Sequence, residues 1–346
     1  MSGDPAARLR GSNVLVTGAA GWLGRRLCER LAAAGAAVRA LVLPGQEPAL
    51  NSLGKDVAVA SGDLRSPEDC RRFCAGSAGA LLFHAAGVIH PRRVSEFYAV
   101  NLEGAKNLLA AAAAQGLRRA VVVSSNSPCG CNPHPGHLFD EDSPYHPFRN
   151  YGRSKMLMEL AAREFHDRGL IETTLIRAPW FYGPGQPPRQ SLFFTMVKEG
   201  KAPVLGDGLT LRSMAYIDNL ADGIFLAAST AKAAGRVYWI ADERPYTWNE
   251  VLDTIALVLK EDFGMEVSGR RLRLPDFVGT AADWADALIQ GCGLYHSKVH
   301  VLAEANKDIA CSVRRARSEL GYAPQVALRE GMRRSVAWCL EQGIPV

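Results

Sequence analysis

The stretch that decides the fold is a glycine-rich turn, in which residues 17–24 read Thr-Gly-Ala-Ala-Gly-Trp-Leu-Gly. It follows an apolar run that predicts a buried parallel strand, and it precedes a predicted helix over residues 22–34. Gly18 allows a tight turn, Gly21 lets the backbone approach a bound group, and Gly24 lets the helix pack closely on the strand. Because the helix N-terminus then offers free N–H groups to phosphate, the turn predicts a dinucleotide-binding site.

Strands and helices alternate through the first half of the chain. This order predicts a parallel sheet with right-handed crossovers, the doubly wound Rossmann fold of the α/β class. We predict strands at 13–17, 37–43, 56–60, 80–83, 120–124 and 171–177, and helices at 22–34, from 66, at 94–114 and at 151–168. We expect a flexible N-terminal tail, an NAD(P)-binding Rossmann domain, and a smaller C-terminal substrate-binding lobe from which segments around 204–240 return to the Rossmann core. These parts are residues 1–10, 11–180 and 181–346.

The composition narrows the classes of function. The 346 residues carry a net charge of only +5, and their basic residues are scattered, which argues against a nucleic-acid partner. No apolar run approaches the about 20 residues that span a membrane, and the polar N-terminus lacks the apolar core of a signal peptide. Because the eight cysteines are spread over a long chain, we expect reduced thiols in a cytoplasmic protein.

A second motif is Tyr151-Gly152-Arg153-Ser154-Lys155. Four residues apart on a helix, Tyr151 and Lys155 face the same way. An ammonium group beside a phenol stabilises the phenolate, which predicts that the pKa of Tyr151 falls below its usual value of about 10. The motif follows a predicted strand that ends at the carboxyl edge of the sheet, where ligands of such folds bind. We therefore predict that Tyr151 and Lys155 form an acid/base pair.

Further sequence motifs, spread over nearly the whole chain, match those of one known enzyme family. Together with the two motifs above, the chain resembles the extended short-chain dehydrogenase/reductases, which include NAD-dependent epimerases and dehydratases, dihydroflavonol reductases and 3β-hydroxysteroid dehydrogenases. The motifs that carry this resemblance are Gly62-Asp63-Leu64, His84-Ala85-Ala86-Gly87, Asn101 to Gly104, Ser124-Ser125, Arg177-Ala178-Pro179, Tyr182-Gly183-Pro184-Gly185 and Glu319-Leu320-Gly321-Tyr322-Ala323-Pro324.

The resemblance implies an NAD(P)-dependent oxidoreductase and a role for each matching residue. Ser125, Tyr151 and Lys155 would be catalytic; Ser125 would hold the substrate oxygen, with Ser124 as the alternative. Substrate would contact Ser125, Asn126, Trp180, Phe181 and Arg212. Cofactor would contact Gly18, Gly21, Trp22, Leu23, Gly24, Asp63, Leu64, Ala85, Ala86, Gly87, Tyr151, Lys155 and Pro179.

Three points stay open at this stage. Val42 and Leu43 occupy the positions that decide between NAD and NADP, and they carry neither the acid nor the arginine that would choose. Asn101 either fixes a helix irregularity or caps the helix. The cluster of Cys129, Cys131, His134 and His137 has a spacing that suggests zinc, but it lies on a loop that shapes substrate pockets in this family, so we expect no metal.

Two substrate classes compete, and we also expect a homodimer. Aromatic residues after Pro179 favour a dehydrogenase or reductase of a hydrophobic, sterol- or terpenoid-like substrate, similar to the 3β-hydroxysteroid dehydrogenase branch. Arg212 stands where nucleotide-sugar epimerases and dehydratases bind a diphosphate, which makes such an enzyme the alternative. Phe277, Ala281, Trp284, Leu288 and Ile289 share one helical face, and Trp284 lines a substrate cavity or packs in the core. The helices predicted at 94–114 and 151–168 resemble the pair through which relatives dimerise.

Overall fold

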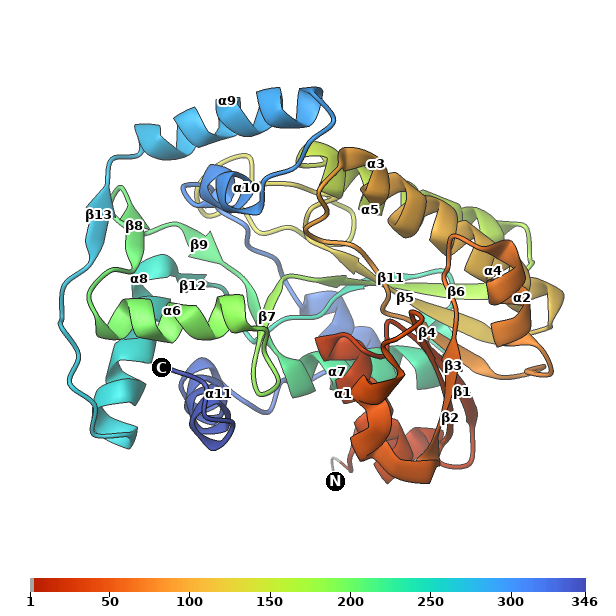
Figure 1. Ribbon diagram of the computed structural model, residues 1–346. Coiled ribbons are helices and arrows are strands. Elements are labelled where there is room, and N and C mark those ends of the chain that lie inside the picture. The colour runs from red at the N-terminus through yellow and green to blue at the C-terminus, as the bar shows by residue number, and fades with distance from the viewer. Residues whose placement is uncertain (1–2) are drawn as a thin grey trace.

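The computed structural model describes residues 3–346 and confirms the predicted fold class (Figure 1). Seven strands form the main sheet in the spatial order β11-β6-β5-β4-β1-β2-β3, and every neighbouring pair is parallel. The order reverses between β1 and β4, which is the crevice where doubly wound folds bind nucleotides. The strands of this sheet are β1 (Asn13–Thr17), β2 (Ala37–Val42), β3 (Val57–Ser61), β4 (Leu81–His84), β5 (Arg119–Ser125), β6 (Glu172–Ala178) and β11 (Val237–Trp239).

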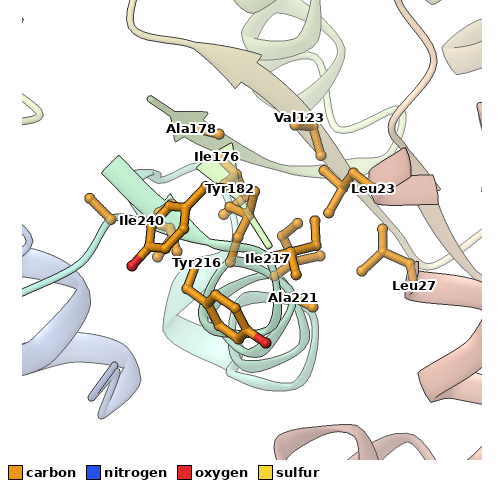
Figure 2. Close-up of a cluster of buried hydrophobic side chains, with 14 of the residues drawn as sticks. Leu23, Leu27, Val123, Ile176, Ala178, Tyr182, Tyr216, Ile217, Ala221 and Ile240 are labelled. Atoms are coloured by element: carbon orange, nitrogen blue, oxygen red, sulfur yellow. The ribbon is translucent and has the colours of Figure 1, made fainter. Parts of the chain in front are cut away.

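Helices cover both faces of the sheet. On one face α1 (Trp22–Ala33) and α7 (Ile217–Ser229) pack against side chains such as Val123 and Ile176 (Figure 2). On the other face α2 (Pro67–Cys74), α4 (Ala105–Ala114) and α5 (Arg149–Asp167) pack against the alternate strand residues, among them Leu82. Both faces are apolar because each parallel strand is buried on its two sides.

The helix predicted at 94–114 is broken. It consists of α3 (Val94–Phe97), a π-helical segment (Tyr98–Gly104) and α4. Asn101 lies in the π-helical segment, accepts a hydrogen bond from the backbone N–H of Val88 at 2.8 Å, and donates to Ser154 Oγ at 3.1 Å. Asn101 therefore fixes a helix irregularity and does not cap a helix.

The N-terminal tail expected over residues 1–10 contains a short helix, and residues 1–2 of it lie outside the described residues. Residues Pro5–Leu9 form a 3-10 helix that begins where Asp4 accepts a hydrogen bond from the N–H of Ala6 at 2.9 Å. Ala6 and Leu9 are buried in the same core cluster as residues of α7. A sequence with so few apolar residues gives no periodic signal for this short helix, and its order comes from tertiary packing.

The second lobe is built from short pieces. Its two-stranded sheets pair β10 with β7, β12 with β9, and β13 with β8. In Figure 1, α9 lies along one edge of the molecule with α10 beneath it. Among residues 3–346, no helix combines the length and the apolar character that crossing a bilayer requires. The elements are β7 (Trp180–Tyr182), α6 (Pro188–Lys198), β8 (Pro203–Leu205), β9 (Leu211–Arg212), β10 (Met214–Tyr216), β12 (Tyr246–Thr247), α8 (Trp248–Leu257), β13 (Leu272–Leu274), α9 (Phe277–Gly291), α10 (Ser297–Glu304) and α11 (Leu328–Glu341).

Candidate active site

The glycine turn between β1 and α1 leaves no room for a side chain at Gly18 or Gly24. Gly18 has a φ of +70°, and a Cβ there would lie 2.7 Å from the backbone N of Ala86. A Cβ on Gly24 would lie 2.1 Å from the carbonyl O of Gly18. The N–H of Gly21 donates to that same carbonyl at 2.9 Å, and α1 starts at the next residue. The turn therefore presents backbone N–H groups and the positive end of a helix, which fit the diphosphate of a dinucleotide.

Other expected cofactor residues gather at the ends of the neighbouring strands. The carboxylate of Asp63 accepts hydrogen bonds from the N–H and Nε of Arg65, each at 2.9 Å, and this pairing lowers the pKa of Asp63. Leu64 is buried against Gly104. Ala85, Ala86 and Gly87 follow β4 directly, and a Cβ on Gly87 would lie 3.3 Å from Lys155 Nζ. The turn after β4 therefore runs between the glycine turn and Lys155.

Trp22 joins the first helix to the second lobe. Its indole N–H donates to the carbonyl of Pro184 at 2.7 Å, and its ring centroid lies 4.8 Å from that of Phe181. Leu23, next in the motif, is buried in the core that Figure 2 shows. Of these two expected cofactor residues, Trp22 thus borders the second lobe and Leu23 packs inside the domain.

Tyr151 and Lys155 lie on the first two turns of α5. Lys155 is buried, and its Nζ donates to the carbonyl of Val123 at 3.0 Å. Burial lowers the pKa of Lys155 to about 8. Burial also raises the pKa of Tyr151 to about 12, although a hydrogen bond with Ser125 opposes this rise. The predicted lowering of the Tyr151 pKa is therefore wrong, because loss of hydration outweighs the charges around the phenol.

The two serines at the end of β5 have different surroundings. Ser124 Oγ donates to Glu159 Oε1 at 2.6 Å, and both residues are buried. Glu159 is also paired with Arg177 at 2.9 Å, beneath the sheet edge. Ser125 Oγ instead lies 3.3 Å from Asn126 Oδ1 and turns toward Tyr151. Ser124 thus hydrogen-bonds the buried Glu159–Arg177 ion pair, whereas the hydroxyl of Ser125 hydrogen-bonds the phenol of Tyr151.

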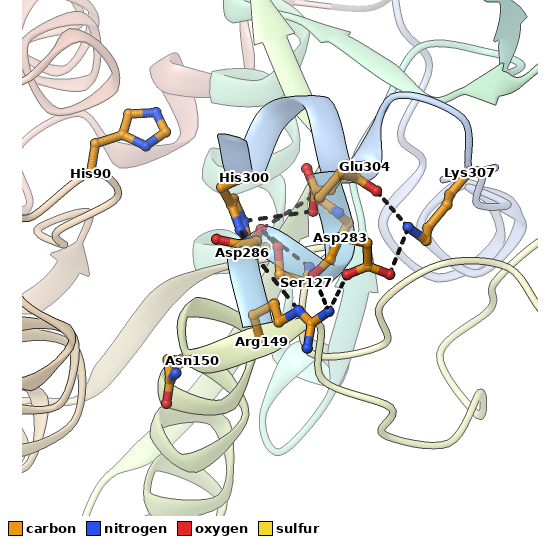
Figure 3. Close-up of polar contacts among 12 residues, drawn as sticks. His90, Ser127, Arg149, Asn150, Asp283, Asp286, His300, Glu304 and Lys307 are labelled. Atoms are coloured by element: carbon orange, nitrogen blue, oxygen red, sulfur yellow. Dashed lines mark hydrogen bonds and ion pairs between the residues drawn. The ribbon is translucent and has the colours of Figure 1, made fainter. Parts of the chain in front are cut away.

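The first turn of α5 is held by the second lobe, which sequence reasoning missed. Arg149, with a φ of +53°, is the one non-glycine residue of 3–346 in the left-handed region. Its guanidinium pairs with Asp283 and lies 3.8 Å from Asp286 (Figure 3). Asn150 donates its side-chain N–H to Gln290 at 2.9 Å. Since these residues directly precede Tyr151, α9 positions the start of the helix that carries the phenol.

Further second-lobe side chains approach Tyr151. Tyr295 packs edge-on against Phe97 with ring centroids 5.1 Å apart, and Phe97 in turn lies 5.6 Å from the Tyr151 ring. The hydroxyl of Tyr295 is 3.0 Å from His90 Nδ1. The charge of Arg189 acts on the phenols of both tyrosines. None of these residues belongs to a sequence motif, so the sequence gives no local signal that they lie near Tyr151.

Of the expected substrate residues, Ser125 ends β5 and Asn126 follows it. The others lie on β7 and β9 of the second lobe. Pro179 is buried between β6 and β7, and Trp180, which follows it, is 39% exposed. Trp180 stacks on Trp248 with ring centroids 5.9 Å apart. Arg212 on β9 donates to the backbone carbonyl of Glu304, so its guanidinium is held by the end of α10.

Two other expectations concern residues away from the phenol. Trp284 is 72% exposed, so it neither lines a cavity nor packs in the core. In the loop after β5, Cys129 is buried, while the rings of His134 and His137 meet edge-on with centroids 5.3 Å apart. Within the part of the chain that the structure describes, no three acidic, histidine or cysteine side chains come together as metal ligands.

The fold, the glycine turn and the serine–tyrosine–lysine arrangement define an enzyme of the extended short-chain dehydrogenase/reductase class. The chain belongs to the NAD dependent epimerase/dehydratase family, whose model matches residues 14–241. It is therefore an NAD(P)-dependent enzyme, and the glycine turn fits that cofactor.

Individual relatives agree with this placement. The Sinorhizobium fredii protein y4nL, itself uncharacterised, is 54% identical over 95% of this chain and 96% of its own length. A 2-alkyl-3-oxoalkanoate reductase of Shewanella oneidensis is 28% identical over 93% of this chain and 85% of its own length. Among solved structures, UDP-glucuronic acid 4-epimerase from Bacillus cereus in complex with NAD has the same fold, with a TM-score of 0.75, 20% identity, and coverage of 95% of this chain and 99% of that chain.

Proposed function

We propose that the protein transfers hydride between NAD(P) and the carbinol or carbonyl carbon of a hydrophobic, sterol- or terpenoid-like substrate, as in the 3β-hydroxysteroid dehydrogenase-like branch. The observation that carries this proposal is the aromatic cluster directly after Pro179. Trp180 stacks on Trp248, and Phe193 lies against both, with ring centroids 6.2 and 5.2 Å away. Burying apolar ligand surface against such aromatic rings contributes about 25 cal/mol of binding free energy per Å², so no charged group is needed to hold the ligand.

The chain's own residues supply the acid and its support. The cofactor supplies the hydride acceptor or donor, which is its intrinsic chemistry. Because burial raises the pKa of Tyr151 to about 12, the phenol holds its proton at neutral pH and is suited to protonate a carbonyl oxygen during reduction. Ser125 stabilises the developing negative charge on that oxygen by donating its hydroxyl hydrogen. The reductase activity in the name of the Shewanella relative supports a ketone substrate.

The alternative is a nucleotide-sugar epimerase or dehydratase that keeps its cofactor bound. Two cations favour it: Arg212 on β9, and Arg189, whose charge acts on Tyr151. A diphosphate needs paired cationic donors with free N–H groups. The guanidinium of Arg212 already donates to the carbonyl of Glu304, which leaves fewer of its N–H groups for a diphosphate and weakens this alternative.

A substrate screen tests the proposal. Purified protein is mixed with NADH or NADPH and a panel of sterol-like ketones, 2-alkyl-3-oxo acids and UDP-sugars, and absorbance at the reduced nicotinamide band is followed. We expect oxidation of the cofactor with hydrophobic ketones, and an Arg212→Ala variant whose KM for them changes by less than a few-fold. Turnover of a UDP-sugar that disappears in Arg212→Ala would instead establish the epimerase alternative.

A further inference from the structure

Helix α9 carries an apolar stripe on its outer face. Phe277, Trp284 and Leu288 are 70, 72 and 71% exposed, and Ala281 lies between them at helical spacing. The turn that follows α9 adds Leu294, which is 54% exposed. An exposed apolar residue standing alone needs no explanation, but a continuous stripe of large ones marks an interaction surface.

The inner face of the same helix is polar and firmly held. Asp286 is fully buried and accepts hydrogen bonds from Gln290 at 2.9 Å and from His300 at 2.8 Å. Asp283 pairs with Arg149 and with Lys307 (Figure 3). A surface helix usually turns its apolar stripe toward the core, and α9 does the reverse. Because buried polar contacts fix its rotation, the apolar stripe is held outward.

Exposed cations flank the stripe at both ends. Arg270 and Arg273 precede α9, Arg93 is bridged through its backbone to Leu294, and Lys298 lies on the first turn of α10. Within residues 3–346 none of these four side chains takes part in an ion pair, whereas the neighbouring Arg271 is paired with Asp253. Asp276, which directly precedes Phe277, is an exposed carboxylate that forms no ion pair within residues 3–346, so the four cations leave the flanks with a net positive charge.

We propose that this α9 face, made of Phe277, Ala281, Trp284, Leu288 and Leu294 with its flanking cations, docks on the surface of an anionic lipid bilayer. Tryptophan with phenylalanine and leucine, bordered by lysine and arginine, is the composition of helices that lie in the membrane interface. Each basic residue near an anionic surface strengthens binding. A two-fold contact with a second copy would instead bring two positively charged borders together, which is unfavourable.

Docking at this face also bears on the active site. The same helix holds Arg149 and Asn150, which directly precede Tyr151, through its inner face. A docked α9 therefore lies one helix away from the phenol, on the side of the second lobe. The proposal concerns a lipid surface and does not depend on which substrate class the site takes.

Sedimentation with vesicles tests the proposal. Wild-type protein is mixed with sucrose-loaded vesicles of phosphatidylcholine alone, or of phosphatidylcholine and phosphatidylglycerol in equal parts. We expect binding to the anionic vesicles that weakens as salt is added. Trp284→Ser and Phe277→Ser should each lower the partition coefficient by about tenfold, because each removes a large apolar group from the interface. Leu340→Ser is the matched control, since Leu340 is 42% exposed on α11, a helix at the opposite side of the molecule from α9 in Figure 1. This variant should bind like the wild type.

A charge variant and a mass measurement complete the test. Arg273→Gln/Lys298→Gln changes no apolar residue and should lower binding to anionic vesicles by about 25-fold, at roughly fivefold per charge. Wild-type protein that stays in the supernatant with anionic vesicles at low salt would overturn the proposal. So would light scattering in which Trp284→Ser halves the mass of the wild-type particle, because the face would then be covered by another copy of the chain.

Discussion

Two adjacent serines end β5, and we expect that replacing Ser124 mainly lowers stability whereas replacing Ser125 mainly lowers catalytic activity. In Ser124→Ala, Glu159 loses a hydrogen bond of 2.6 Å in a buried site, although Arg177 and Tyr145 still bind it at 2.9 and 2.8 Å. A buried hydrogen bond to a charged group is worth about 1.5–3 kcal/mol, so we expect the free energy of unfolding to fall by that amount. Ser125→Ala removes contacts near 3.3 Å and the hydrogen bond with Tyr151, all with uncharged groups, which should cost only about 1 kcal/mol.

The expected catalytic effects have the opposite order. Ser125→Ala should lower kcat by about 10²–10³-fold, as expected when a donor to a developing oxyanion is removed, while Ser124→Ala should stay within a few-fold for the folded enzyme. Urea unfolding measures the free energy of unfolding of each variant. Oxidation of reduced cofactor with the best ketone measures kcat. A Ser124→Ala enzyme that is stable but inactive, beside an active Ser125→Ala enzyme, would refute both the serine assignment and the argument from Glu159.

Three further predictions concern the cofactor turn, the pH profile and assembly. Gly21→Asp places a carboxylate against the expected diphosphate, so calorimetry should show a collapse of NAD(P) affinity in a protein that still unfolds cooperatively; unchanged affinity would rule out this turn as the site. Because burial lowers the pKa of Lys155 to about 8 while that of Tyr151 is about 12, reductive kcat/KM should be level near pH 7 and fall as pH rises through about 8, where Lys155 loses its proton; a level profile up to pH 10 would contradict this. We propose a two-fold dimer through α4 and α5, where Ala110, Ala114 and Leu160 are exposed, so light scattering should give twice the 37.4 kDa of the chain, and Leu160→Glu should give a monomer.

Helices and strands could be predicted where their sequence pattern depends only on residues close together in the chain. The predicted strand at 13–17 matches β1, and the predicted helix at 22–34 ends one residue beyond α1, because glycine spacing and apolar runs depend on neighbours along the chain. The break in the helix predicted at 94–114 depends on Asn101, whose partners Val88 and Ser154 lie 13 and 53 residues away. The sequence around Asn101 does not show that these partners will lie beside it in the fold.

Two errors have a common physical origin in burial. The spacing of Tyr151 and Lys155 predicts a shared face, but the pKa of a phenol also depends on how much water the fold removes from it. Likewise, the spacing of Phe277, Trp284 and Leu288 shows that they share a face of α9 and does not tell whether that face points inward. The direction is set by Asp283, Asp286 and Gln290, whose partners come from α5 and α10.

The most direct test of the central claim is to follow the transferred hydrogen. Enzyme is incubated with reduced cofactor that carries deuterium at C4, in the transferable position, together with the ketone found in the screen, and the product is analysed by mass spectrometry. We predict an alcohol heavier by one mass unit at the carbinol carbon and one cofactor oxidised per product formed. Tyr151→Phe should slow this transfer by about 10²–10⁴-fold with cofactor affinity unchanged. Conversion of a nucleotide sugar with no net oxidation of cofactor, and no labelled alcohol from any ketone, would contradict the account.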